Sequence, residues 1–309
     1  MGPTQSEGGF VAGTIVVTGC DAAHFGLASE LLASLGHAAP KREFSIGFVN
    51  VGAGVLPDQI QAGVDIVFPL ADTGFIDEGR RGFRVAYLAV KARLPEFFPG
   101  FDTYVWLDGD TWVQNAVGIE QIAHCAQLAD FAVHPELDAN YFAEPIPSTR
   151  TLWAYPSIYG EDEARKQITT PMVNGGVFGA RAGSPPWSAW HEALRELTSR
   201  AEGRAEFYFS DQIPLHRLIA LKRLSIYPLR ALNNWMIHAA RPAVDFKRRR
   251  LLAPTFPHEE INIIHLTGTT KAARYKLGDG DEEISFRYQA VRALFDRHDP
   301  LVSSTQASS

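Results

Sequence analysis

Cysteine and long apolar runs are both scarce in this sequence. It contains only two cysteines, Cys20 and Cys125, which supply neither a disulfide framework nor the paired spacing of a zinc site. We therefore expect a reducing, cytoplasmic environment. No apolar stretch is long enough to cross a bilayer. Residues 1–13 contain no Lys or Arg and no apolar segment of the kind found in a signal peptide.

Positive charge is also in short supply. The sequence has 29 Lys and Arg against 35 Asp and Glu, for a net charge of -6, and this acidic balance argues against a nucleic-acid partner. The exception is the basic cluster Lys247-Arg248-Arg249-Arg250. For this cluster two interpretations are open: a solvated basic loop, and a patch for an anionic acceptor or for peripheral contact with a membrane.

The rest of the chain alternates short apolar runs with helical periods, which predicts an α/β fold with a mostly parallel central sheet flanked by helices. The expected strands are 14–18, 44–51, 64–69, 104–107, 131–134, 174–181, 224–229 and 261–266. The expected helices are 25–35, ended by Gly36, 81–94, ended by Pro95, and 186–201, 211–221 and 284–295. We expect one domain over 14–275, with a flexible segment 1–13, a C-terminal helical extension 276–302 and a disordered tail 303–309.

The most informative segment is YVWLDGDT, residues 104–111. Its apolar, aromatic and β-branched residues predict a buried strand. Asp108 and Asp110 follow at the carboxyl end, where open α/β sheets bind their ligands. Side chains one residue apart in an extended segment point the same way, so both carboxylates could bind one hard cation. Because Asp-Gly is also a common turn pair, an acidic turn and a metal site are both open on this motif alone.

A histidine far along the chain ends another apolar run, in the segment IIHLTGTTK at 263–271. An imidazole beside two carboxylates favours a borderline metal such as Mn²⁺, so His265 is a candidate third ligand. Gly268 permits a tight turn near a ligand, and Lys271 can place a positive charge on a phosphate. A histidine in such a position is more often a hydrogen-bonded core residue, and its spacing to Gly268 and Lys271 is what favours a functional role.

Four motifs occur in a characteristic order: Asp-x-Asp after a strand, Asn-Gly-Gly at 174–176, Asp-Gln at 211–212, and His-x-x-Gly-x-x-Lys at 265–271. In this order the chain resembles the family 8 glycosyltransferases, over about residues 15–271. The resemblance implies the Rossmann-like GT-A fold of nucleotide-diphospho-sugar transferases. It also implies retaining transfer of a sugar from a nucleotide donor, with a UDP-sugar favoured, to a glycan or other hydroxyl acceptor. The implied cofactor is Mn²⁺, with Mg²⁺ as the alternative.

Carried over residue by residue, the resemblance assigns the metal to Asp108, Asp110 and His265. It places Gln212 under the anomeric carbon and Asp211 beside it as the catalytic pair. The residues implied in binding the donor or its nucleotide are Thr18, Cys20, Asp21, Arg84, Lys91, Gly109, Asn174, Gly175, Gly268 and Lys271. Asp211-Gln212 is also an ordinary helix start with Ser210 as its cap, and both interpretations can hold together.

Residues 135–173 contain several prolines and aromatics and are expected to form a long loop. Sugar rings stack on aromatic side chains, so the acceptor candidates are Tyr141, Trp153, Tyr155, Asn234 and Trp235. Packing of these aromatics onto the domain is an equally open interpretation. Gly175 stands where the family usually has Ser or Thr, and Ala272-Ala273 replace the frequent Pro-Trp. These departures concern the acceptor and the outer contacts of the donor sugar, and leave the metal site unaffected.

Two other functions remain alternatives. A haloacid dehalogenase-type phosphatase also has a strand ending in Asp-x-Asp, with Asp108 then acting as the nucleophile. Trp112 occupies the position where that class has Thr or Val. A non-catalytic protein that binds a sugar nucleotide or a glycan could have the same fold, because fold does not imply function.

Overall fold

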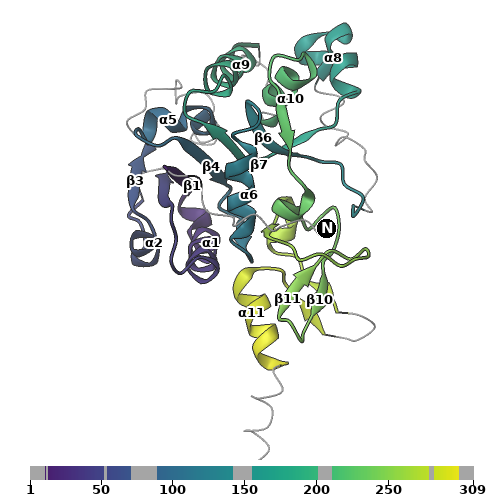
Figure 1. Cartoon of the computed structure of the whole chain (residues 1–309). Helices are drawn as coiled ribbons and strands as arrows, with labels where there is room; N and C mark the ends of the chain where they lie inside the picture. The colour runs from purple at the N-terminus through teal and green to yellow at the C-terminus, as the bar shows by residue number, and fades with distance from the viewer. Residues whose placement is uncertain are drawn as a thin grey trace, which may run out of the picture.

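The computed structural model describes residues 11, 13–51, 54–70, 89–141, 155–200, 211–277 and 282–298. A seven-stranded sheet of order β3-β2-β1-β4-β7-β6-β8 forms its centre (Figure 1). The strands are β1 (Thr14–Cys20), β2 (Ser45–Asn50), β3 (Ile66–Pro69), β4 (Thr103–Leu107), β6 (Phe131–Pro135), β7 (Val173–Arg181) and β8 (Ile226–Pro228). All neighbours in this sheet are parallel except β7, which runs antiparallel to both β4 and β6. The predicted α/β class is confirmed.

Helices cover both faces of this sheet because its strands are apolar on both sides. In β1, Ile15 and Val17 belong to one core cluster while Val16 belongs to the other, as the two-residue period of a strand requires. The first cluster is covered by α5 (Leu94–Phe97), α9 (Pro186–Arg200) and α10 (Gln212–Ala220). The second is covered by α1 (Phe25–Ala38), α2 (Asp58–Gly63) and α6 (Val117–Cys125).

A smaller sheet of order β5-β12-β9 brings distant parts of the chain together. It consists of β5 (Thr111–Val113), β12 (Ile263–His265) and β9 (Trp235–Met236). β12 is antiparallel to β5, so His265 lies opposite Thr111, and it is parallel to β9, so His265 also lies opposite Met236. This register places the segment after β4 next to the segment around residue 265.

The C-terminal part adds two hairpins and a helix at one end of the molecule (Figure 1). They are β10 (Ala243–Asp245) with β11 (Arg250–Leu252), β13 (Tyr275–Lys276) with β14 (Glu283–Ile284), and α11 (Tyr288–Arg297). The short 3-10 turns are η1 (Ala22–His24), η3 (Lys91–Arg93), η4 (Ala231–Asn233) and η5 (Gly268–Lys271). An ion pair between Arg287 and Glu30 ties the start of α11 to α1. The domain boundaries expected at 13, 275 and 302 stay predictions.

The basic cluster lies mostly in the turn between β10 and β11. Three of its four members form ion pairs: Arg248 with Asp245, Arg249 with Asp296 and Arg250 with Glu260. A contact of this cluster with a membrane or an anionic acceptor stays a prediction. Among the helices that the structure describes, none has the length and apolar character needed to span a bilayer.

Several predicted element boundaries are wrong. α1 continues through Gly36 to Ala38, because a glycine inside a helix costs only about 1 kcal/mol. Pro95 does not end a helix but lies in the first turn of α5, where its missing N–H needs no partner. The last helix begins at Tyr288, four residues later than residue 284.

The expected long loop at 135–173 contains helical structure among its described residues. Residues 155–159 are helical, and α8 (Glu161–Ile168) follows them. The sequence of α8 has acidic residues in its first turn and basic residues in its last, which suits the helix dipole. Its apolar periodicity is weak because only Ala164 and Gln167 are buried, so a hydrophobic pattern could not reveal it.

Candidate functional site

The two carboxylates after β4 lie in a tight turn. The N–H of Thr111 donates to the carbonyl of Asp108 at 2.9 Å, and its hydroxyl donates to the same oxygen at 2.8 Å. The expected extended segment at 108–110 is therefore wrong: β4 ends at Leu107, and β5 begins at Thr111 after the turn. An acidic turn and a metal-ligand pair are consequently not alternatives here, because the turn itself presents both side chains.

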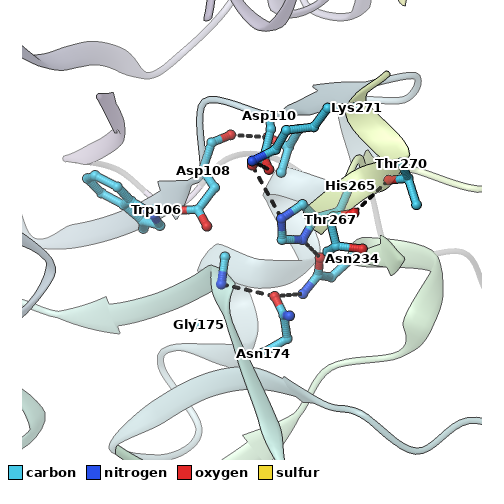
Figure 2. A network of polar contacts seen from close by, with 12 residues as sticks. Trp106, Asp108, Asp110, Asn174, Gly175, Asn234, His265, Thr267, Thr270 and Lys271 are labelled. Carbon is cyan, nitrogen blue, oxygen red and sulfur yellow. Dashed lines mark hydrogen bonds and ion pairs between the residues drawn. The ribbon is translucent and has the colours of Figure 1, made fainter. Parts of the chain in front are cut away.

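Asp108, Asp110 and His265 form a cluster with one ligand atom from each residue, and these atoms all lie within 4.8 Å of one another. The Nε2 atom of His265 lies 3.4 Å from Oδ1 of Asp110 (Figure 2). The register of β5 with β12 explains this proximity, since Asp110 directly precedes β5. The three residues predicted to bind a metal are thus brought together by the tertiary structure.

Two lysines hold these carboxylates. Nζ of Lys271 lies 2.8 Å from Asp110, while Nζ of Lys91 lies between Asp108 at 2.8 Å and Asp211 at 2.9 Å. Burial opposes the charge on Lys91, but the two carboxylates outweigh it and raise the pKa of this lysine. Burial likewise opposes ionisation of Asp110, but His265 and Lys271 outweigh it and hold its pKa below the usual range. The site is therefore built around charge pairs.

Asp211 titrates differently. It is buried, and desolvation together with the nearby Asp108 raises its pKa despite the ion pair with Lys91. Asp211 lies at the start of α10, and its Oδ2 atom is 2.9 Å from Nζ of Lys91. Asp211 thus ties α10 to the residues after β4. It occupies the N-cap position of α10, but its side chain makes no capping hydrogen bond, and Ser210, the expected cap, lies outside the described residues.

A cavity of about 310 Å³ opens beside the cluster. The predicted site residues that line it are Lys91, Asp108, Asp110, Asn174, Gly175, Asp211, Gln212, His265 and Gly268. The lining residues that the sequence analysis did not single out are Glu136, Met172, Gly176, Ile213, His238 and Thr267. Seven separate segments of the described chain therefore meet around one polar cavity.

Glu136 is the functional candidate that sequence reasoning missed. Its Oε1 accepts hydrogen bonds from Asn174 Nδ2 at 3.1 Å and from Gln212 Nε2 at 3.2 Å. Burial raises the pKa of this carboxyl group, although the two hydrogen bonds oppose the rise. A signal was available, because Glu136 follows the carboxyl end of β6, which runs in the same direction as β4. The rule that singled out Asp108 applies equally to Glu136.

The amide of Gln212 has a defined orientation. Its Nε2 donates to the carbonyl of Val173 at 2.7 Å and to Glu136. An amide nitrogen has two hydrogens, and both are directed at protein acceptors. These two contacts fix which way the amide of Gln212 faces.

The backbone of β7 approaches the cluster closely at Gly176. A Cβ atom there would lie 2.2 Å from Cε1 of His265 and 2.9 Å from Oδ2 of Asp108. At Gly175 the nearest atoms, on Asp211 and Gln212, would be 3.6 Å away, which is ordinary contact. Within the Asn-Gly-Gly motif, only the second glycine, Gly176, therefore has no room for a side chain.

These two glycines give a matched prediction. Gly176→Ala should displace His265 or Asp108 and lower the affinity for Mn²⁺ by at least about 10-fold, as misplacement of metal ligands does. Gly175→Ala should bind Mn²⁺ almost as the unmodified protein does. Titration of each protein with Mn²⁺, followed by the electron paramagnetic resonance signal of the free ion, measures both. Equal affinities for the two variants would contradict the role of Gly176.

The remaining predicted residues lie in different places. Thr18 and Cys20 are at the buried end of β1, where a Cβ on Gly109 would be 3.5 Å from Cβ of Cys20. Burial, Asp21 and Asp110 raise the pKa of the Cys20 thiol to about 12, so its thiolate is not available at neutral pH. The role of this strand end, including Asp21, in binding the nucleotide stays a prediction.

The acceptor candidates are dispersed. Trp235 and Tyr155 are buried in core clusters and do not line the cavity, and the hydroxyl of Tyr155 lies 2.6 Å from His216. Tyr141 packs against Trp235 and hydrogen-bonds the carbonyl of Asn234 at 3.2 Å. Tyr141, Tyr155 and Trp235 therefore pack onto the domain and do not line the cavity. Arg84 and Trp153 lie outside the described residues.

Neither a family model nor a curated protein matches the sequence, but solved structures do resemble the fold. The galactosyltransferase LgtC, in complex with donor and acceptor sugar analogues, has a TM-score of 0.52 at 13% identity over 92% of this chain and 95% of that one. Mouse xyloside xylosyltransferase 1 has a TM-score of 0.53 at 14% identity over 82% and 96%. The bifunctional glycosyltransferase WbbM has 0.52 at 13% over 87% and 47%. The chain has the GT-A fold of these enzymes, while membership of family 8 stays a prediction.

Proposed function

We propose that this protein is a metal-dependent glycosyltransferase that moves a sugar from a nucleotide donor, a UDP-sugar, to an acceptor hydroxyl with retention of configuration. The observation that supports this most is the cluster of Asp108, Asp110 and His265 with two lysines at the edge of a polar cavity. In a GT-A fold this is the end of the sheet where ligands bind.

The residues of the cluster fit a divalent cation. Two carboxylates and one imidazole suit Mn²⁺, with Mg²⁺ as the alternative, and their ligand atoms already converge. Lys91 and Lys271 each place an ammonium group 2.8 Å from one of the carboxylates, which shows that positive charge is favoured at these positions. A cation held there would act as a Lewis acid on a departing diphosphate.

The chain's own charges would assist that departure. Lys271 is one-third exposed and ends the turn η5, which begins at Gly268 with φ of 57°. This lysine is near enough to the cavity to turn from Asp110 to a phosphate oxygen. Stabilisation of negative charge that develops on the leaving group is the main means of lowering the barrier to such a transfer.

Other lining residues of the cavity would face the sugar. The carbonyl oxygen of Gln212 and the carboxylates of Glu136 and Asp211 are electron-rich groups, which suit an oxocarbenium-like transition state. In a same-face mechanism the leaving phosphate takes the proton of the acceptor hydroxyl, so no strong base is needed. Among the described lining residues, the histidine–carboxylate pair of His265 and Asp110 belongs to the proposed metal site.

A donor panel tests the proposed activity. The protein is incubated with UDP-glucose, UDP-galactose, UDP-xylose and UDP-N-acetylglucosamine, with and without Mn²⁺, and released UDP is measured. We expect slow release that requires Mn²⁺ and is faster with one donor than with the others. Hydrolysis of simple phosphoesters would instead support a phosphatase, and binding of a donor without turnover would support a binding protein.

Gln212 provides the variant that separates catalysis from binding. Gln212→Ala should lower kcat by about 10-fold or more, because the carbonyl group facing the transition state is lost, while the affinity for the donor changes little. Donor affinity is measured by calorimetry and kcat with the preferred donor of the panel. An effect on affinity alone would mean that Gln212 only binds the donor.

A further inference from the structure

A chain of side-chain amides lies behind the metal-ligand cluster. Nδ1 of His265 lies 2.8 Å from Oδ1 of Asn234, and Nδ2 of Asn234 donates to Oδ1 of Asn174 at 3.0 Å. Figure 2 shows this chain running from β7 to the imidazole, on the side away from Lys271. Asn234 is fully buried and Asn174 nearly so, so water does not replace these contacts.

The polarity of this chain is fixed by the backbone. The N–H of Gly176 donates to Oδ1 of Asn174 at 3.0 Å, and a backbone amide can only donate. The carbonyl side of Asn174 must therefore face Gly176 and Asn234. Its Nδ2 then faces Glu136, whose Oε1 accepts from it at 3.1 Å, which gives the same orientation independently.

The orientation of Asn174 decides that of Asn234, and Asn234 decides the proton position on His265. Because the carbonyl of Asn174 accepts, Asn234 must present its NH₂ group to Asn174 and its carbonyl to the imidazole. An acceptor facing Nδ1 requires the proton on Nδ1, which leaves the lone pair on Nε2. That lone pair faces Asp110, whose Oδ1 is 3.4 Å away.

We infer that Asn234, oriented by Asn174, is the positioning residue that holds His265 as the Nδ1–H tautomer and directs its Nε2 lone pair at the carboxylate pair. This inference deepens the proposed metal site and rests on it. Groups that hold the second nitrogen of a ligating histidine in this way commonly change metal affinity by 10- to 100-fold when they are replaced. It also gives Asn234 a role other than acceptor binding.

Two substitutions separate this role from mere packing. Asn234→Leu removes both the acceptor for His265 and the donor to Asn174, at similar volume. Asn234→Asp also removes the donor, but keeps an oxygen that can accept from Nδ1. A purely structural role predicts that both variants behave alike, whereas a tautomer role predicts that only the leucine variant fails.

The direct measurement is a long-range ¹H–¹⁵N spectrum of metal-free protein labelled at histidine, recorded at a pH where the rings are neutral. His265→Gln assigns the signals by their disappearance. We expect the Nδ1–H pattern in the unmodified protein and in Asn234→Asp, and its loss in Asn234→Leu. Titration with Mn²⁺ alone should show a 10- to 100-fold loss of affinity in Asn234→Leu only.

Three results would overturn the inference: an Nε2–H pattern in the unmodified protein, an unchanged tautomer in Asn234→Leu, or equal loss of Mn²⁺ affinity in both variants. Ile122→Val controls for a general loss of stability. Ile122 lies on α6 and is fully buried in the core cluster that α1, α2 and α6 cover, so this substitution should be mildly destabilising. If the leucine variant does not fold, the spectrum of the unmodified protein still decides. The spectra need no donor, so failure to transfer a sugar would refute the proposed function without touching this result.

Discussion

Asp110→Asn is expected to abolish Mn²⁺-dependent donor binding and to lower turnover by more than about 100-fold, since replacement of groups behind a ligand alone costs up to that amount. The substitution keeps the shape of the side chain but removes the charge that attracts both the cation and Lys271. UDP release and Mn²⁺ titration measure the two effects. Asp65→Asn is the matched control, because Asp65 holds Arg42 and the N–H of Ile46 far from the cavity.

The same variant should change the pH dependence of stability. His265 and Lys271 outweigh burial and lower the pKa of Asp110, so this carboxylate stabilises the metal-free protein above the unfolded pKa of about 4. That contribution is lost as the pH falls through the lower folded value. Asp110→Asn should therefore be less stable at neutral pH, and its stability should fall less than that of the unmodified protein as the pH is lowered.

An active Asp110→Asn variant with unchanged Mn²⁺ affinity would contradict the metal assignment.

Lys91→Met should have the largest effect on stability. Lys91 is 2% exposed and is paired with Asp108 and Asp211, and its loss leaves two carboxylates without their shared cation. Removal of one partner from a buried ion pair typically costs about 3–5 kcal/mol. Chemical denaturation at pH 7.5 measures the loss, which should accompany a fall in turnover.

Two further measurements show whether uncompensated charge is the cause. Lys91→Met combined with Asp211→Asn should recover part of the lost stability, because one buried negative charge is removed. Mild acidification should also restore stability in Lys91→Met. The pKa of buried Asp211 is raised in the folded protein, and such a carboxyl group favours folding below that pKa and opposes it above. If neither change restores stability, Lys91 contributes by packing alone.

The metal motif was visible in the sequence because each part obeys a local rule. Asp108 and Asp110 follow an apolar strand, and His265, Gly268 and Lys271 follow another, so the ends of two strands could be located without a structure. Local rules were less reliable for where a helix ends. α1 continues past Gly36, and Pro95 lies in the first turn of a helix and does not end one. Packing on the sheet stabilises a helix beyond its propensity.

For the acceptor candidates, the sequence could not distinguish a binding role from packing in the core. Tyr155 and Trp235 are aromatic residues that the sequence alone could assign either to a sugar or to the core, and burial places them in the core. Glu136 was overlooked because one carboxylate without a neighbouring motif carries little signal, although its position after β6 is that of Asp108 after β4. Only contacts between segments distinguish such residues.

By itself, the sequence determined the α/β class, the strand ends that carry the ligands, and the order of motifs that resembles a glycosyltransferase family. The tertiary structure decided which of these residues meet. The pairing of β5 with β12 brings His265 beside Asp110, the absence of a side chain at Gly176 allows β7 to approach both, and Lys91 holds Asp108 to Asp211. The physical reason is that hydrophobic periodicity depends on residues that are neighbours in the sequence. Charge pairing and close approach also join residues far apart in the sequence, such as Lys91 with Asp211 and His265 with Asp110.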